Sequence, residues 1–329
     1  MAERGAGRLR GGIDLGGTKI QTAVLDDDNV VAGQARAQTP TAGGPADVAA
    51  AMLAALREAA AAAGVATAEL THVGVGSPGE VDAATGTVTS ARNLPGWERS
   101  YPLGPQLAEQ LGTAVVLGND VQVATDAEAQ LGAGRSYGSM LGVFWGTGVG
   151  GGIVLDGKPW LGLGGAGEIG HVVVKIDGAQ CPCGRRGCME AYAGRNAMER
   201  RARELHAKGE PTELFKIAHK RGRERLTSGI WAAALERKDQ LATRLIDRAV
   251  EALGAGVASV DNVLDVEVII LGGGLGVRLG QPYAEKIADA MLPHLFHDYR
   301  PPPVLVADLG DLGGAIGASL LTPMAATAA

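Results

Sequence analysis

The sequence predicts an α/β protein with two domains, and three observations lead to this prediction. The chain has 329 residues, which is enough to bury two hydrophobic cores. Short runs rich in β-branched residues alternate with helical patterns of apolar residues. The order strand, glycine turn, strand occurs near residue 14 and again near residue 147, and further helices and strands follow each time. We therefore expect an internal duplication of topology, in which two α/β halves face each other across a cleft.

In the first half, local signals mark each element. Pro45 suits the first turn of a helix, the alanine-rich tract after it favours helix, and Gly64 stops it. A short strand from His72 ends in the turn 76–79. The strands expected in this half cover 12–18, 20–25, 30–38, 72–76 and 114–117, and the helices cover 45–63, 102–111 and 121–131.

In the second half, the clearest element is a long amphipathic helix, because apolar residues recur every three or four positions from Leu241 to Leu264. The segment 216–225 is dense in lysine and arginine, which predicts a solvated helix face or, alternatively, contact with an anionic ligand. The strands expected here cover 141–145, 152–155, 171–176, 266–271 and 304–307, and the other helices cover 195–207, 281–295 and 312–321.

The composition argues against several classes of protein. Aromatic residues make up 4% of the chain and the formal net charge is −6, and both disfavour a nucleic-acid partner. No segment approaches 18 consecutive apolar residues, so no membrane span is expected. The first ten residues contain three arginines but no apolar core, unlike a secretory signal. Together with reduced cysteines, these features predict a cytoplasmic protein.

The three cysteines of the chain, Cys181, Cys183 and Cys188, fall within eight residues, and His171 precedes them in the order His-x9-Cys-x-Cys-x4-Cys. Three thiolates and one imidazole make a closed tetrahedral zinc site of the structural kind, with no position left for water. The alternative is a disulfide or three buried thiols. Two cysteines separated by one residue make a strained bridge, however, and an odd number leaves one thiol over. We therefore expect zinc, and a loop that the metal holds rigid.

Three glycine-rich loops follow predicted strands, at 14–19, 146–152 and 272–276. Glycine allows backbone N–H groups to approach phosphate oxygens, and the threonines of the first two loops add hydroxyl donors. The P-loop spacing is absent, and the Gly-x-Gly-x-x-Gly match at Gly146 leads into a strand instead of the helix of a dinucleotide fold. Any one loop can be a simple hairpin turn, but three of them favour a protein that binds phosphates.

These motifs resemble the ROK family (repressor, open reading frame, kinase). The resemblance rests on the loop Asp14-Leu-Gly-Gly-Thr-Lys19 and on the loop 146–152. It rests above all on Glu168-Ile-Gly-His171 followed by Cys181-Pro-Cys-Gly-Arg-Arg-Gly-Cys-Met-Glu190. The match extends over residues 12–320, nearly the whole chain.

The resemblance implies a sugar kinase with the two-domain actin/hexokinase-like (ribonuclease H-like) ATPase fold, which has a cleft between its domains. The small α/β domain would comprise residues 1–120 and 311–329. The large α/β domain, which carries the zinc site, would comprise residues 121–310. A homodimer is expected from the resemblance alone.

The resemblance also implies roles for individual residues. The residues that would bind ATP are Asp14, Gly16, Gly17, Thr18, Lys19, Gly146, Thr147, Gly148, Gly273 and Gly274. The residues that would bind the sugar are Asn93, Asn119, Asp120, Glu168, His171 and Glu190. Asp120 would act as the general base, and Asp14 would hold waters of the magnesium ion that accompanies ATP. His171 would serve zinc with one ring nitrogen and the sugar with the other.

The implied activity is that of a glucokinase, which converts ATP and glucose to ADP and glucose 6-phosphate and so feeds glycolysis. A kinase for N-acetylglucosamine, N-acetylmannosamine, mannose or fructose is an alternative, because the implied sugar-binding residues do not distinguish these substrates from glucose. In addition, Gly118 and Val121, on either side of the Asn-Asp pair, depart from the usual pattern of the family. Polyphosphate is an alternative donor. A non-catalytic sugar sensor is a further alternative, whereas a repressor needs a helix-turn-helix for which the 13 residues before Asp14 are too few.

Overall fold

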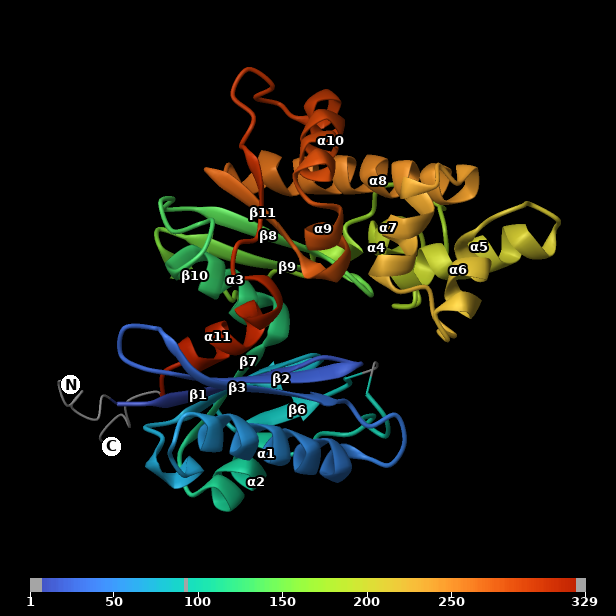
Figure 1. Ribbon diagram of the computed structural model, residues 1–329. Helices are drawn as coiled ribbons and strands as arrows, with labels where there is room; N and C mark the ends of the chain where they lie inside the picture. The colour runs from blue at the N-terminus through green and yellow to red at the C-terminus, as the bar shows by residue number, and fades with distance from the viewer. Residues whose placement is uncertain (1–7, 92–93, 324–329) are drawn as a thin grey trace, which may run out of the picture. The chain divides into compact units, whose positions relative to one another are not determined.

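The structure is a computed structural model that describes residues 8–91 and 94–323. The chain divides into two compact units. The first contains the described residues up to Leu131, the segment Leu161–Gly165, and the described residues from Leu309 onward. The second contains Gly132–Trp160 and Ala166–Asp308. Each unit is built around its own five-stranded sheet (Figure 1).

The sheet of the first unit has the strand order β3-β2-β1-β4-β7. Its strands are β1 (Arg10–Leu15), β2 (Lys19–Leu25), β3 (Val31–Gln38), β4 (Val73–Ser77) and β7 (Val115–Asn119). The first three form an antiparallel meander, whereas β1, β4 and β7 run parallel. The parallel register places Asp14, Gly76 and Gly118 in one row across these strands. Their carboxyl ends therefore lie at one edge of the sheet.

Helices cover both faces of this sheet. They are α1 (Pro45–Ala62), α2 (Leu103–Leu111), α3 (Asp120–Gln130) and α11 (Gly313–Leu320), with the 3-10 turns η1 (Thr67–Glu69) and η4 (Gly310–Leu312). α1 and α2 lie on one face, and α3 and α11 lie on the other (Figure 1). A Cβ atom at Gly74 would lie 1.7 Å from the carbonyl oxygen of Ala318 in α11, so glycine is required for this close approach. The small hairpin of β5 (Glu80–Asp82) and β6 (Thr87–Thr89) stands apart from the sheet.

The sheet of the second unit has the order β10-β9-β8-β11-β12. Its strands are β8 (Met140–Trp145), β9 (Val149–Leu155), β10 (Lys158–Pro159), β11 (Val268–Gly272) and β12 (Val304–Val306). As in the first unit, three strands pair antiparallel and two more continue the sheet in parallel. The predicted duplication of topology is therefore present. The register pairs Phe144 with Gly272, so the two glycine-rich segments that follow β8 and β11 leave the same edge.

The second unit is rich in helices. They are α4 (Glu190–Ala193), α5 (Arg195–Ala207), α6 (Leu214–Lys220), α7 (Ser228–Glu236), α8 (Gln240–Leu264), α9 (Gly273–Leu279) and α10 (Gln281–Met291), with the 3-10 turns η2 (Ile169–His171) and η3 (Leu292–His294). The predicted long helix is α8, which begins where the Asp239 carboxylate accepts the N–H of Ala242 and ends at Asp265 in the left-handed region. Its apolar stripe shares one core with β8 and β11. In the described part of the chain, no helix combines the length and the apolar character needed to cross a bilayer.

Two local predictions are wrong in informative ways. The strand expected at 171–176 is absent: His171 ends the 3-10 turn η2, and Val173 makes only an isolated bridge to Cys188. This β-branched segment precedes the cysteine loop, and its backbone hydrogen-bonds to Gly187 of that loop. Strand propensity reflects fit to a pleated surface, and because the segment joins no sheet, Ile176 is 84% exposed. The basic segment 216–225 is not one helix, since α6 ends at Lys220.

Candidate active site

The carboxyl edge of the first sheet carries both the predicted base, Asp120, and Asp14, which is predicted to hold waters of the magnesium ion. Asn119 ends β7 and caps α3, because its Oδ1 atom accepts the backbone N–H groups of Val121 and Gln122, each at 3.1 Å. Asp120 is the first residue of α3, where the helix dipole favours a negative charge. Asp14 lies two strands away, in the row that ends at Gly118. In α/β sheets this edge is where ligands bind.

The turn between β1 and β2 has the form expected of a phosphate-binding loop. Gly16 and Lys19 close it with a backbone hydrogen bond of 3.0 Å, and the Thr39 hydroxyl donates to the Gly16 carbonyl at 2.6 Å. Gly17 and Thr18 occupy the tip. The Lys19 ammonium lies 3.3 Å from the carboxylate of Asp311, in η4.

Asp14 is half-buried beside this ion pair. Gly314, in the first turn of α11, comes so close that a Cβ atom there would lie 2.6 Å from the carboxyl carbon of Asp14. Burial raises the pKa of Asp14 to about 6, while the charge of Lys19 opposes the rise and that of Asp311 adds to it. A half-buried carboxylate next to a glycine turn is a suitable acceptor for a hydrated cation.

The second unit forms a matching turn at residues 146–148. Gly146 donates to the Gly148 carbonyl at 3.0 Å, which leaves Thr147 at the tip. The segment predicted as the third glycine loop is in fact the start of α9. Gly273 has a φ of +78°, and a Cβ atom there would lie 2.6 Å from the Trp145 carbonyl oxygen. Gly273 and Gly274 therefore let the α9 backbone pass directly against the end of β8.

The cysteine loop places four ligand atoms at distances that suit one metal ion. The ligand atoms of His171, Cys181, Cys183 and Cys188 all lie within 4.8 Å of one another. The Cys183 and Cys188 sulfurs are 3.8 Å apart, and the Nδ1 atom of His171 is 3.8 Å from the Cys181 sulfur. The edge of a tetrahedron with metal–sulfur bonds of about 2.3 Å is about 3.8 Å, whereas a disulfide bond is about 2.05 Å long. The cluster can hold a metal, and the thiols are free.

The two glutamates that flank the cluster extend it toward the 146–148 turn. The Nε2 atom of His171 faces Glu168, with 3.8 Å to its Oε2 atom, so the two ring nitrogens of this histidine serve different neighbours. Glu190 begins α4 and accepts the Val149 N–H at 3.0 Å. A Cβ atom at Gly148 would lie 2.2 Å from the same Glu190 oxygen. The predicted sugar ligands of this unit therefore sit between the metal cluster and the glycine turn.

Two groups in these surroundings escaped the sequence-based prediction, and one predicted residue cannot be placed. Asp311 pairs with Lys19 from 292 residues further along the chain, and only the fold reveals this contact. Arg195 reaches the hydroxyl of Thr147 at 2.9 Å, although the sequence shows it only as the start of an amphipathic helix. Asn93 lies outside the described residues.

Comparison with known proteins identifies relatives along nearly the full length. A glucokinase of Thermotoga maritima is 34% identical over 309 residues, which is 92% of this chain and 95% of that protein. An N-acetylgalactosamine kinase of a Shewanella species is 33% identical over 94% of this chain and 95% of its own. The solved structure of a ROK family glucokinase from Streptomyces griseus, in complex with glucose and AMPPNP, superimposes with a TM-score of 0.82 at 31% identity and covers 94% of this chain and 98% of that one.

These likenesses confirm the predicted two-domain actin/hexokinase-like fold. The ROK family model matches residues 10–325. The chain is therefore a member of the ROK family.

Proposed function

We propose that this chain is an ATP-dependent hexose kinase whose substrate is glucose. The observation that carries the proposal is its similarity, along nearly its whole length, to glucokinases, one of them solved with glucose and AMPPNP. The arrangement of residues in each unit supports it. Both glycine turns follow the end of a strand, and each has a threonine at its tip.

The first unit would supply the base. The Asp120 carboxylate accepts the proton of the 6-hydroxyl group as that oxygen bonds to the γ-phosphorus, and the bond from this phosphorus to the β-phosphate oxygen breaks to release ADP. Asn119 uses its Oδ1 atom as a helix cap, so its Nδ2 group is the part that would donate to a sugar oxygen. Lys19 and the turn 16–18 would bind phosphate oxygens. Asn93 is proposed as a further sugar ligand.

Magnesium would accompany ATP and neutralise phosphate charge during transfer. Asp14 would hold water molecules of this ion, because it is a carboxylate beside the 16–18 turn and accepts hydrogen bonds once it is ionised.

The second unit would bind sugar hydroxyls and would also contribute residues to nucleotide binding. Glu168, His171 and Glu190 would accept and donate hydrogen bonds at fixed angles, which is how a protein distinguishes the hydroxyls of a hexose. The turn 146–148, with Gly273 and Gly274, would bind the nucleotide.

We propose that the metal of the cysteine cluster is zinc. The donor set of three sulfurs and one imidazole nitrogen, with its 3.8 Å spacing, fits a closed tetrahedral zinc site. The ion would hold His171 by Nδ1 and thereby fix the direction of Nε2 toward the substrate.

The test is product formation by the purified protein with Mg·ATP and a panel of hexoses and N-acetylhexosamines. We expect glucose to be the best acceptor. Asp120→Asn should retain glucose binding and lose at least about 10²-fold in turnover, the low end for general acid–base catalysis. Asp156→Asn makes the same chemical change in an exposed turn and should leave turnover unchanged. Near-normal turnover of Asp120→Asn would refute the role of Asp120.

A second candidate substrate class is the N-acetylhexosamines, favoured by the relative that is an N-acetylgalactosamine kinase at 33% identity. Preference for an N-acetylhexosamine in the panel would identify this class. Activity with polyphosphate but not with ATP would show that polyphosphate is the phosphate donor. Absence of transfer with either donor, in a folded protein that still binds glucose, would indicate a sugar sensor.

A further inference from the structure

One arginine beside the 146–148 turn carries a positive charge that its surroundings do not neutralise. Arg195, the first residue of α5, donates from one terminal nitrogen to the Thr147 hydroxyl at 2.9 Å. Its other terminal nitrogen donates to the Ser228 hydroxyl at 3.2 Å. Both partners are neutral, and within residues 8–91 and 94–323 the guanidinium forms no ion pair with a carboxylate.

A buried carboxylate on the same helix already pairs with other arginines. Glu199, one turn further along α5, has a side chain that is only 6% exposed. It accepts hydrogen bonds from Arg203 at 2.8 Å, from Arg225 at 3.1 Å and from the Leu226 N–H at 3.0 Å. Although burial opposes its ionisation, these contacts hold the pKa of Glu199 below its usual value. Its single negative charge therefore faces two other cations.

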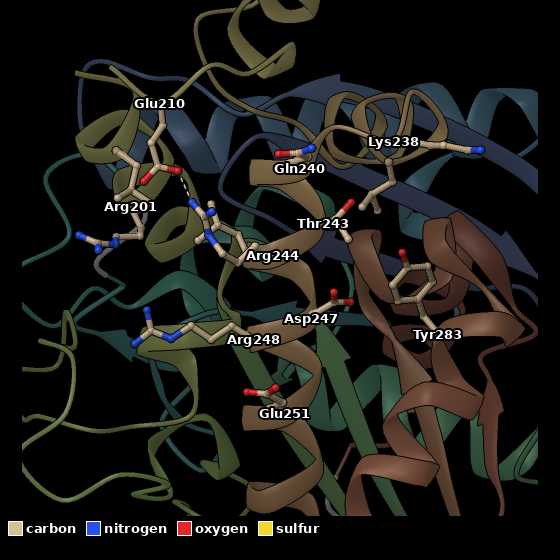
Figure 2. Close-up of a pocket in the computed structure, with 13 residues that line it drawn as sticks. Arg201, Glu210, Lys238, Gln240, Thr243, Arg244, Asp247, Arg248, Glu251 and Tyr283 are labelled. Atoms are coloured by element: carbon tan, nitrogen blue, oxygen red, sulfur yellow. Dashed lines mark hydrogen bonds and ion pairs between the residues drawn. The ribbon is translucent and has the colours of Figure 1, made fainter. Parts of the chain in front are cut away.

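Two exposed arginines of the same unit, by contrast, pair with carboxylates. A recess of about 920 Å³ is lined in part by side chains of α5, α8 and α10 (Figure 2). Within it Arg244 points to Glu210. Arg201, which also lines the recess, pairs with Glu204 at 3.0 Å. Arg195 is partly buried; burial and the nearby Arg225 lower its pKa, and the charge of Glu199 offsets only part of this shift. A cation that is withdrawn from water with only hydroxyl partners is costly unless an anion binds to it.

The position of Arg195 is fixed by the backbone of the turn itself. Its N–H donates to the Gly146 carbonyl and that of Asn196 donates to the Thr147 carbonyl, each at 3.1 Å. Just before it, the Ala193 carbonyl accepts the indole N–H of the buried Trp145 at 2.7 Å. These bonds tie the start of α5 to the end of β8 and to the turn, so the Arg195 backbone is held beside Thr147.

The starts of two further helices complete the surroundings. Ser228 begins α7, and a Cβ atom at Gly274 of α9 would lie 3.6 Å from its hydroxyl oxygen. A Cβ atom at Gly146 would lie 3.8 Å from the Gly274 nitrogen. The two segments of this unit proposed to bind the nucleotide therefore meet beside Arg195.

We propose that Arg195 is a nucleotide-binding residue whose guanidinium pairs with a phosphate group of ATP at the 146–148 turn. The inference rests on the proposed function only in that the ligand is a nucleoside triphosphate. Thr147 and Ser228 hold the fork of the guanidinium before the nucleotide arrives, which lowers the entropy lost on binding. A guanidinium suits this task because its planar set of donors matches phosphate oxygens.

The test is the dissociation constant of Mg·ATP, measured by calorimetry without sugar, for wild type, Arg195→Gln and Arg195→Lys. Loss of a charge-assisted contact should weaken ATP binding by Arg195→Gln about 10- to 100-fold. Arg195→Lys keeps the charge and should recover part of this loss. Arg201→Gln removes the same charge from the same helix and should bind ATP as wild type does. Glucose affinity and the melting temperature should stay near wild type in all three variants.

Two results would overturn the inference. One is ATP binding by Arg195→Gln within about twofold of wild type. The other is an equal loss in Arg195→Gln and Arg195→Lys, accompanied by lower melting temperatures, which would make the residue a clamp for the turn. Sugar phosphorylation by wild type, assayed in parallel, distinguishes failure of this inference from failure of the proposed function. A wild type that binds ATP through Arg195 but phosphorylates no sugar would refute the function and leave the inference standing.

Discussion

Replacing Asp14 by asparagine should change the pH dependence of stability in a direction that the structure fixes. The Asp14 carboxyl is partly buried against Gly314, and its pKa rises from 3.8 to about 6. The folded chain therefore binds this proton more tightly than the unfolded chain does. The stability that the group contributes is complete below about pH 3.8 and is lost as the pH rises to about 6. Asparagine cannot ionise, so the variant does not undergo this loss.

The size of the effect follows from the two pKa values. Between pH 4.5 and pH 8, a carboxyl that titrates at 3.8 unfolded and about 6 folded loses about 2 kcal/mol of stabilisation. The free energy of unfolding of Asp14→Asn minus that of wild type should therefore increase by about 2 kcal/mol over this interval. Other titrating groups, such as the buried Asp126 with its pKa raised to about 7, are common to both proteins and cancel in the difference.

Urea denaturation at pH 4.5 and pH 8, without nucleotide or magnesium, measures this difference. Two further variants test the cause. Lys19→Met should move the titration of Asp14 to higher pH, because it removes the cation that favours the carboxylate. Asp311→Asn should move it to lower pH, because it removes a like charge. A stability difference that is the same at both pH values, or one that shrinks at pH 8, would show that Asp14 is not held as a buried acid.

Two other predictions concern the metal cluster and the packing of the first unit. The purified protein should contain about one zinc ion per chain by elemental analysis, and Cys188→Ser should lose both the zinc and glucose affinity. Arg186→Gln, an exposed change in the same loop, should keep both. A metal-free wild type that binds glucose normally would contradict the proposed role of zinc. Gly74→Ala should destabilise the fold by at least about 3 kcal/mol, since its Cβ atom would lie 1.7 Å from the Ala318 carbonyl oxygen, whereas Gly165→Ala adds a methyl group where no atom lies within 4 Å and should be close to neutral in calorimetry.

Local patterns along the chain predict much of what the structure contains. The periodicity at 241–264, with an aspartate before it, predicts α8, and the repeated order of strand, glycine turn and strand predicts two similar sheets. The spacing of His171 and the three cysteines predicts a cluster whose sulfurs lie at metal-binding distance. These features depend on residues that are close together in the chain, so the local sequence is enough to predict them.

Other features depend on contacts that chain order does not encode. The sequence makes 171–176 look like a strand because it is rich in β-branched residues, but no sheet edge is available to it beside the cysteine loop. The pairing of Lys19 with Asp311 and the partial burial of Asp14 against Gly314 join residues separated by most of the chain. In the sequence Arg195 resembles any arginine of an amphipathic helix. In the fold its guanidinium hydrogen-bonds to Thr147, while Glu199 pairs with Arg203 and Arg225.

The sequence by itself thus determined the family, the order of most strands and helices, and the residue types that phosphate, sugar and metal binding require. Only the tertiary structure decided which of these groups are buried, which carboxyl groups keep their protons to higher pH, and which cations have a carboxylate partner. The reason is physical: the identity of a side chain is local, whereas its ionisation and its free hydrogen-bonding capacity depend on every element packed around it.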